Sequence, residues 1–240
     1  MKKLGILGGM GPMAGAYFYR RIIENTGAKN DAEHIPVVLL GDASIPDRTE
    51  SILCSDNGAR AALLRGVDFL CRSGVDAIAV PCNTAHAYLG DMRACSRAPI
   101  LDMPRLCVSY AAALGNRRLG VLCTRGCHVA GVYESAAAEL AVDVVPLVPR
   151  HVTEVERLIY RQKAGERVTR DMYLPYIEKM YEDGADCVLL ACTEISCVFD
   201  GAVSEGLVDA LEILAKTTVA LFKGMISEVE VGAFLRASAV

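Results

Sequence analysis

Short apolar runs alternate with stretches of helical periodicity along the first half of the chain. Apolar runs occupy residues 4–9, 36–40 and 75–80, and amphipathic helical patterns cover residues 13–25 and 58–72. Strands that are apolar on both faces and alternate with helices are typical of a parallel sheet covered on both sides. The pattern therefore predicts an α/β fold.

The second half of the chain repeats this plan. Residues 119–122 echo residues 4–7, and residues 184–190 echo residues 74–80. The later block keeps a constant offset of 110 in three pairs: Gly74 and Gly184, Asp76 and Asp186, and Cys82 and Cys192. The earlier block is offset by 115, so the copies differ by a short insertion or deletion. Two matching blocks in the same order predict duplicated α/β lobes with a boundary near residues 102–118.

Composition and charge narrow the function classes. The 240 residues are 52% hydrophobic and carry a net charge of −4, without the basic stripe that nucleic-acid binding requires. The N-terminal lysines precede a glycine turn at residues 8–12, which does not suit the apolar helix of a signal peptide. No stretch is long and apolar enough to span a bilayer. We therefore expect a cytoplasmic protein with no nucleic-acid or membrane partner.

Ten cysteines are spread along the chain without a C-x-x-C pair. A chain of this size and apolar content does not need disulfide staples, so reduced thiols in the cytoplasm are the better interpretation. Cys123, Cys127 and His128 have a spacing that suggests a metal, but no second pair of ligands accompanies them. We therefore expect no metal site.

Two of these cysteines, Cys82 and Cys192, follow apolar strands at equivalent points of the two copies. Ligands of open α/β sheets bind beyond the carboxyl ends of the strands, so two facing lobes would each contribute one thiol to a common cleft. Free cysteines are usually buried structural residues, which is our interpretation of the other eight. The polar residues that follow these two, at 83–84 and 193–194, favour a functional role.

A thiolate and a thiol on opposite faces of one carbon form a symmetric proton-transfer device. A thiolate is a good base, and a thiol is a usable acid near neutral pH. The thiolate removes a proton from one face of the carbon, and the thiol gives a proton to the opposite face. The configuration at the carbon is then inverted without a cofactor. The carbanion-like intermediate needs hydrogen-bond donors. Suitable donors at strand ends are Asn83, Thr84, Thr124 and Thr193.

Four strings carry a resemblance to a known family: GGMGP at 8–12, IPDRT at 45–49, PCNTAH at 81–86 and CTE at 192–194. In this order they closely resemble the aspartate/glutamate racemases, the cofactor-independent amino-acid racemases of the Asp/Glu/hydantoin racemase superfamily. The resemblance runs through essentially the whole chain. It implies an isomerase that interconverts the L and D forms of aspartate, glutamate or both, with no cofactor.

By this resemblance Cys82 and Cys192 are the catalytic acid–base pair. The residues that would hold the α-amino and α-carboxylate groups or approach the substrate are Met10, Asn83, Thr84, Thr124 and Thr193. Arg48, in a loop at 46–49, and Lys163 match the family's binders of the distal carboxylate, which a guanidinium can grip with two donors. Taken alone, each of these two cations also fits a solvated surface charge.

The resemblance also implies a homodimer with two pseudo-symmetric lobes, each a mostly parallel sheet flanked by helices, and an active site in the cleft between them. The first lobe would comprise residues 1–103 plus 208–240, and the second residues 104–207. A C-terminal helix around residues 210–225 would pack on the first lobe. Departures from the family pattern bear on substrate choice more than on reaction type, and they are Gly15, Ala191, Cys127 and the segment 102–105.

Two other functions stay open at this point. An enzyme similar to maleate isomerase would use a cysteine as a nucleophile on a small dicarboxylate, which Arg48 and Lys163 also suit. A non-catalytic binder of an acidic amino acid is the other, although binding alone requires no matched thiols. Two roles also stay open for each neighbour of the thiols. His86 either orients the Cys82 thiol or caps the next helix, and Glu194 is either an acid–base partner or a backbone acceptor at a helix start.

Overall fold

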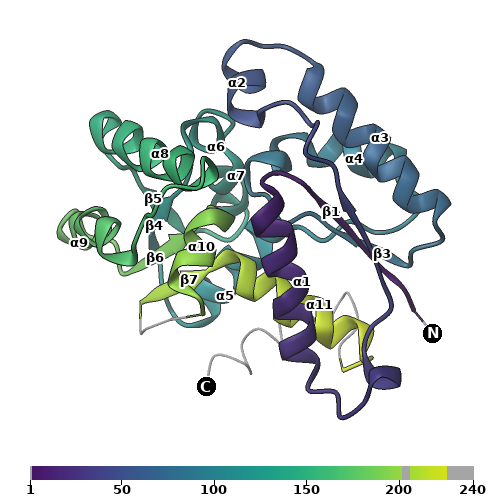
Figure 1. Ribbon diagram of the computed structural model, residues 1–240. Helices are drawn as coiled ribbons and strands as arrows, with labels where there is room; N and C mark the ends of the chain where they lie inside the picture. The colour runs from purple at the N-terminus through teal and green to yellow at the C-terminus, as the bar shows by residue number, and fades with distance from the viewer. Residues whose placement is uncertain (1, 202–205, 226–240) are drawn as a thin grey trace.

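Two parallel sheets form the framework of the protein (Figure 1). A computed structural model describes residues 2–201 and 206–225. The first sheet has the order β2-β1-β3, with β1 (Leu4–Gly8), β2 (Val37–Gly41) and β3 (Ala77–Ala79). The second has the order β5-β4-β6-β7, with β4 (Arg118–Leu122), β5 (Asp143–Val145), β6 (Cys187–Leu190) and β7 (Leu207–Asp209). All pairings between these strands are parallel, and the predicted α/β class is confirmed.

Helices connect the strands and pack on the sheets. They are α1 (Pro12–Thr26), α2 (Arg48–Leu53), α3 (Gly58–Arg72), α4 (Leu89–Cys95), α5 (Met103–Ala113), α6 (Arg125–Val129), α7 (Val132–Ala138), α8 (Pro149–Lys163), α9 (Leu174–Glu182), α10 (Thr193–Phe199) and α11 (Ala210–Phe222). Short 3₁₀ turns are η1 (Asp31–Glu33), η2 (Thr84–Tyr88) and η3 (Arg170–Met172). The helices predicted at 13–25 and 58–72 are observed as α1 and α3.

The strand register reproduces the sequence repeat. Leu4 of β1 pairs with Ala77 of β3, and Leu119 of β4 pairs with Cys187 of β6. The two central strands are thus offset by 115 and their partners by 110, as the repeat predicts. The strand predicted at 75–80 is shorter than expected, because the chain leaves the sheet after β3 and begins to turn toward the site.

The segment predicted as a loop at 46–49 contains the start of helix α2. Asp47 is its N-cap, and the carboxylate accepts a hydrogen bond of 2.9 Å from the Glu50 N–H. Arg48 and Thr49 lie in the first turn and are buried. The prediction was therefore wrong in its local structure, and Arg48 lies inside the protein rather than on a solvated loop.

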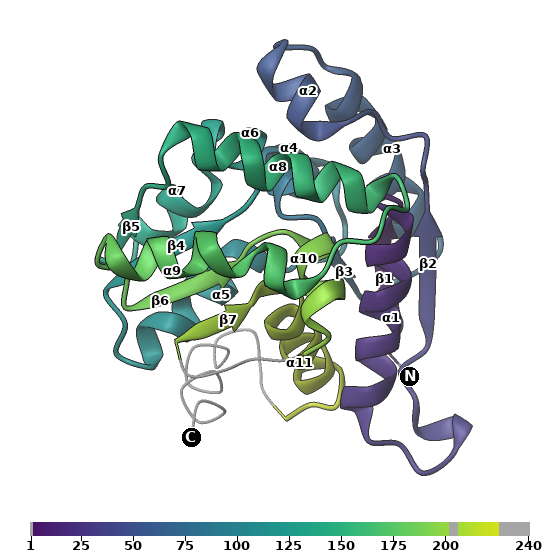
Figure 2. The same ribbon diagram turned by 60° about the vertical axis from the view of Figure 1, so that its left-hand side comes forward.

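A buried apolar cluster joins the two halves of the chain. It includes Leu4 of β1, Leu119 of β4 and Leu214 of α11. Helix α11 lies beside α1 and α5, so the end of the described chain returns to its beginning (Figures 1 and 2). Each fully buried leucine contributes roughly 1.5–3 kcal/mol, and the cluster therefore holds the sheets in a fixed relation. The predicted boundaries of the two lobes stay predictions, with β7 extending the second sheet through Asp209.

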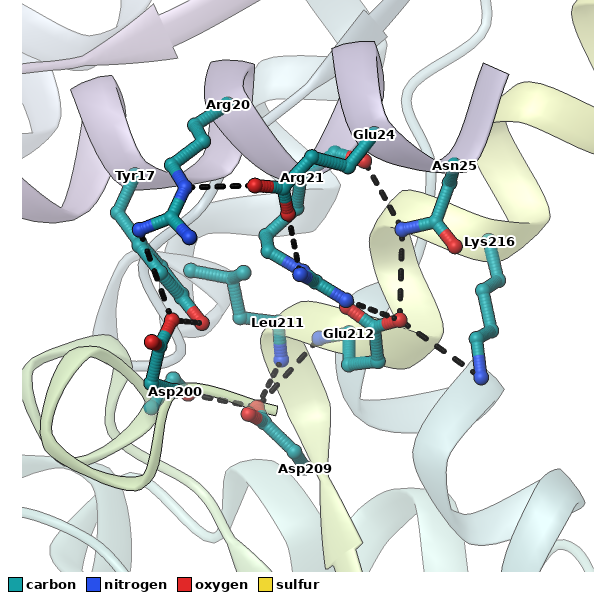
Figure 3. Close-up of polar contacts among 11 residues, drawn as sticks. Tyr17, Arg20, Arg21, Glu24, Asn25, Asp200, Asp209, Leu211, Glu212 and Lys216 are labelled. Carbon is teal, nitrogen blue, oxygen red and sulfur yellow. Dashed lines mark hydrogen bonds and ion pairs between the residues drawn. The ribbon is translucent and has the colours of Figure 1, made fainter. Parts of the chain in front are cut away.

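A polar network ties α1 to α11 (Figure 3). Arg21 of α1 donates to the Glu212 carboxylate from Nε at 2.7 Å and from Nη2 at 3.0 Å. Burial alone would raise the pKa of Glu212, but the bonds from Arg21 lower it below its usual range. Beside this pair, Asp209 caps α11. Its Oδ1 accepts from the Ser196 hydroxyl at 2.6 Å and from the Leu211 N–H at 2.9 Å.

Substituting Asp209 by asparagine is expected to stabilise the protein at neutral pH. Burial raises the pKa of Asp209 to about 6 from an ordinary value of 3.8. Such a carboxyl stabilises the folded state below pH 3.8, and this contribution is lost as the pH rises through about 6. Asparagine keeps an acceptor for Ser196 and removes the buried charge. The free energy of unfolding near pH 7 should therefore rise by up to about 3 kcal/mol.

Thermal melts of wild type and Asp209→Asn near pH 7 and near pH 4 measure this effect. The gain should be clear at the higher pH and much smaller at the lower one. A variant that melts below wild type near pH 7 would show that the charge of Asp209 at the helix start outweighs the cost of its burial.

Candidate active site

Cys82 and Cys192 lie at equivalent strand ends and line one pocket. Cys82 follows the end of β3 and Cys192 follows the end of β6, which is where ligands of parallel sheets bind. The pocket brings together all nine predicted site residues: Met10, Arg48, Cys82, Asn83, Thr84, Thr124, Lys163, Cys192 and Thr193. Four further residues line it, namely Asp47, Thr49, Ala191 and Glu194. The space enclosed between these side chains is about 10 Å³, about the room that one water molecule needs, so the side chains of the site lie close together in this structure.

The Cys192 thiol is held in its protonated form. Its sulfur donates a hydrogen bond of 3.2 Å to Glu194 Oε2, and the residue is buried. Burial and the negative charge of Glu194 raise the pKa of Cys192 well above its usual range, although the charge of Lys163 acts in the opposite direction. In this structure Cys192 is therefore a proton donor rather than a base.

Glu194 connects the two lobes at the site. Its other oxygen, Oε1, accepts a hydrogen bond of 3.0 Å from the backbone N–H of Gly11, the N-cap of α1. The carboxylate thus contacts the Cys192 thiol with one oxygen and accepts from backbone at a helix start with the other, and a role as acid–base partner stays a prediction. That helix is α1 of the other lobe rather than its own helix, α10.

Arg48 reaches the Cys82 side of the pocket. Its Nη1 donates to the carbonyls of Ile45 and Pro46, at 3.3 and 3.0 Å, and its Nη2 donates to the carbonyl of Met10 at 3.2 Å. Burial lowers the pKa of the guanidinium, but the charges of Cys82 and Asp47 raise it, and the net direction is upward. The cation is therefore fixed by backbone acceptors beside the sulfur of Cys82.

His86 supports the backbone of Cys82 and does not contact its sulfur in the described hydrogen bonds. The Met103 N–H donates to Nε2 at 3.2 Å, so Nε2 is the acceptor nitrogen and Nδ1 carries the proton. Nδ1 then donates to the carbonyl of Cys82 at 2.9 Å. Burial lowers the pKa of His86, which keeps the ring neutral. The residue links the Cys82 turn to the start of α5, rather than capping the helix that follows it.

Lys163 and Asp47 lie at the end of the pocket formed by α8 and α2. The Lys163 ammonium lies 5.1 Å from the centre of the Tyr160 ring. Burial raises the pKa of Asp47, but the Glu50 N–H, the Tyr160 hydroxyl and the charge of Lys163 together lower it. Lys163 is therefore a pocket residue with an anionic neighbour and not only a surface charge.

Contacts between the lobes close the rest of the site. The Thr84 and Thr124 hydroxyls lie 2.9 Å apart and join the two strand-end turns. Helix α2 packs on α6 at Gly126, where an added Cβ would lie 2.6 Å from Cα of Thr49. Only glycine permits this close approach of the two backbones.

Tyr133 contacts a pocket residue, and the sequence pattern did not indicate it. It lies on α7, is fully buried, and donates from its hydroxyl to Asn83 Oδ1 at 2.5 Å. Nothing in its flanking sequence distinguishes it from an ordinary core tyrosine. Its contact with Asn83 depends on the packing of α7 against the η2 turn, which is a tertiary contact.

A family model for the Asp/Glu/Hydantoin racemases matches residues 7–218, which include both strand-end cysteines. The chain belongs to this family. The match confirms the predicted resemblance and the predicted enzyme class, an isomerase of the racemase family. The predicted homodimer and cytoplasmic location stay predictions.

Relatives in this family support the assignment. The chain is 26% identical to the broad specificity amino-acid racemase RacX of Bacillus subtilis over 91% of this chain and 97% of that protein. It is 33% identical to a glutamate racemase of Deinococcus radiodurans, but over 58% of this chain and only 49% of that protein. The solved structure of Picrophilus torridus aspartate racemase is 27% identical, with a TM-score of 0.80, and the match covers 93% of this chain and 95% of that one.

Within residues 2–201 and 206–225, no helix combines the length and the apolar character needed to cross a membrane. In the same ranges, no three or more His, Cys, Asp and Glu side chains are grouped so that they could hold a metal ion.

Proposed function

We propose that this member of the racemase family interconverts the L and D forms of an acidic amino acid, aspartate or glutamate, by proton transfer between Cys82 and Cys192. The observation that carries the proposal is the convergence of the two thiols, from equivalent strand ends, on one small pocket. No cofactor takes part in the proposed reaction. The Picrophilus torridus and Deinococcus radiodurans relatives, an aspartate and a glutamate racemase, support the acidic substrate class.

We infer the roles of the two thiols in the resting enzyme from their surroundings. Cys192 holds its proton in the bond to Glu194, whereas Cys82 lies beside the Arg48 cation. The Cys82 thiolate removes the proton from Cα, and the electron pair of that bond moves into the carboxylate. Cys192 then gives its proton to the opposite face of Cα. The reverse reaction uses the same groups with their roles exchanged.

Donors around the α-carboxylate stabilise the intermediate. The hydroxyls of Thr84, Thr124 and Thr193 and the amide of Asn83 line the pocket from both lobes. Negative charge grows on the carboxylate as the proton leaves, so fixed donors there bind the transition state more strongly than the substrate. Loss of one such donor typically costs about 10²- to 10³-fold in rate.

The distal carboxylate is bound by Arg48 and Lys163 in this proposal. Arg48 uses Nη1 and one N–H of Nη2 on backbone carbonyls, while its buried Nε has no protein partner. The Nε–H and the second Nη2–H are therefore left for an anion in the pocket. Lys163 supplies a second positive charge at the α8 end.

Incubation of the purified enzyme with a panel of L-amino acids, followed by chiral chromatography, tests the function. We expect D-aspartate or D-glutamate from the matching L form, and at least about tenfold slower reaction of neutral and basic amino acids. Absence of both acidic D products, with the fold intact by circular dichroism, would refute the proposal.

Substituting Gly126 by alanine is expected to lower kcat/KM about tenfold or more. The new Cβ would lie 2.6 Å from Cα of Thr49, so α2 must shift and move Arg48 with it. A displacement of this kind is costly even when no reacting group is changed. Gly90→Ala is the matched control, because its Cβ would meet nothing within 4 Å. Equal activity of the two variants would show that the α2–α6 contact does not position the site.

A further inference from the structure

The side-chain amide of Asn83 has a hydrogen-bond partner at its oxygen and none in the protein at its nitrogen. The residue is buried and lines the pocket, and its Oδ1 accepts the 2.5 Å hydrogen bond from the Tyr133 hydroxyl. Its Nδ2 is also buried but has no hydrogen-bond partner in the protein. A buried amide N–H without a partner is costly, so this donor is expected to serve a bound ligand.

The Tyr133 hydroxyl acts as the donor toward Asn83, because the amide oxygen that it meets at 2.5 Å can only accept a hydrogen bond. Burial raises the pKa of Tyr133 well above its usual range, so the hydroxyl keeps the proton that it donates. This arrangement leaves the amide nitrogen facing the pocket.

We propose that Tyr133 is a positioning residue that fixes the Asn83 amide with its N–H toward the substrate, which makes Asn83 a donor to the α-carboxylate and not an acceptor for the α-ammonium. This inference rests on the proposed racemase function. The donor gains strength as charge develops on the carboxylate, so its main effect is on the chemical step. Because Tyr133 lies on α7 and Asn83 follows β3, the orientation is set across the two lobes.

Tyr133→Phe tests the positioning role, because it keeps the ring in the core and removes only the hydroxyl. We expect kcat/KM for the acidic amino acid to fall about tenfold, mainly through kcat. In the Asn83→Ala background the same change should alter kcat/KM less than about twofold, since the group it positions is absent. Tyr181→Phe is the control, because its hydroxyl donates to the Gly206 carbonyl outside the pocket.

Equal losses from Tyr133→Phe in both backgrounds would mean that Tyr133 acts through packing, and the proposal would be wrong. Wild-type activity of Tyr133→Phe would overturn it as well. A wild-type enzyme that racemises no amino acid refutes instead the function on which the inference rests.

Asn83→Asp gives a second test that leaves Tyr133 unchanged. Aspartate still accepts from the Tyr133 hydroxyl, but it presents a carboxylate oxygen to the pocket in place of the N–H. If Asn83 donates to the substrate carboxylate, kcat/KM should fall at least about hundredfold through repulsion between like charges. Activity within about threefold of wild type would show that Asn83 accepts from the ammonium, contrary to the proposal. This variant decides the question even if Tyr133→Phe fails to fold.

Discussion

Replacing either Cys82 or Cys192 by serine is expected to lower racemisation by roughly 10³-fold or more while the protein stays folded. A serine hydroxyl is a far weaker acid than a thiol, so it supplies neither the base nor the acid near neutral pH. Both thiols are needed because a single residue cannot reach both faces of Cα. Chiral chromatography measures the loss, and circular dichroism measures the fold.

The two serine variants should also differ from each other. Each keeps one thiol, which can remove the α-proton of one enantiomer and return a solvent proton to the same face. We therefore expect each variant to exchange the α-proton of only one enantiomer, and the two variants to act on opposite ones. Cys187→Ala, a buried cysteine of β6 outside the pocket, is the control for changes in packing. Racemisation at wild-type rate by either serine variant would exclude the two-thiol mechanism.

Arg48→Lys is expected to raise KM for the acidic amino acid about hundredfold. Lysine keeps the charge but replaces a planar fork of five donors with a single ammonium group. It cannot hold the carbonyls of Met10 and Pro46 and at the same time present two parallel donors to a carboxylate. The expected loss, about 3 kcal/mol, corresponds to a charge-assisted two-bond pairing.

Initial-rate kinetics on both aspartate and glutamate measure the Arg48 effect. Arg60→Lys is the matched control, because Arg60 makes a two-bond pairing with Asp91 outside the pocket. An unchanged KM in Arg48→Lys would mean that Arg48 serves only the Cys82 sulfur and the backbone, and that the distal carboxylate is bound elsewhere.

Much of the framework follows from local patterns in the sequence. Apolar runs that alternate with helical periodicity specify a covered parallel sheet, and the 110-residue repeat places Cys82 and Cys192 at matching strand ends. The pairing of Leu4 with Ala77 and of Leu119 with Cys187 bears this out in the strand register. Such features are predictable because strand and helix periods are properties of contiguous segments.

Contacts between distant segments were not predictable in the same way. Tyr133 contacts Asn83, which lies fifty positions away in the sequence, and no residue type or spacing predicts such a contact. The close approach of Gly126 to Thr49 depends on how α2 packs against α6. By contrast, the start of α2 did carry a local signal, since Asp47 followed three residues later by Glu50 has the spacing of a helix-capping pair.

Glu194 illustrates an intermediate case. The sequence showed a carboxylate two residues after Cys192, but not that its two oxygens divide between the thiol and Gly11 of the other lobe. Its role depends on the packing of α1 against α10, which is a tertiary contact. Residue types at a strand end thus predict the available chemistry, while the packing of the lobes determines which group each side chain serves.

The initial fate of the α-hydrogen in heavy water tests the two-thiol account most directly. Wild-type enzyme is given the L form of its acidic amino acid in heavy water, and the early D and remaining L pools are separated and examined by proton NMR. The account predicts deuterium at Cα of the new D form, because the thiol on the opposite face delivers a solvent-derived hydron, and protium in the remaining L form. Protium retained in the D product, or deuterium entering the L pool as fast as the D form appears, would contradict it.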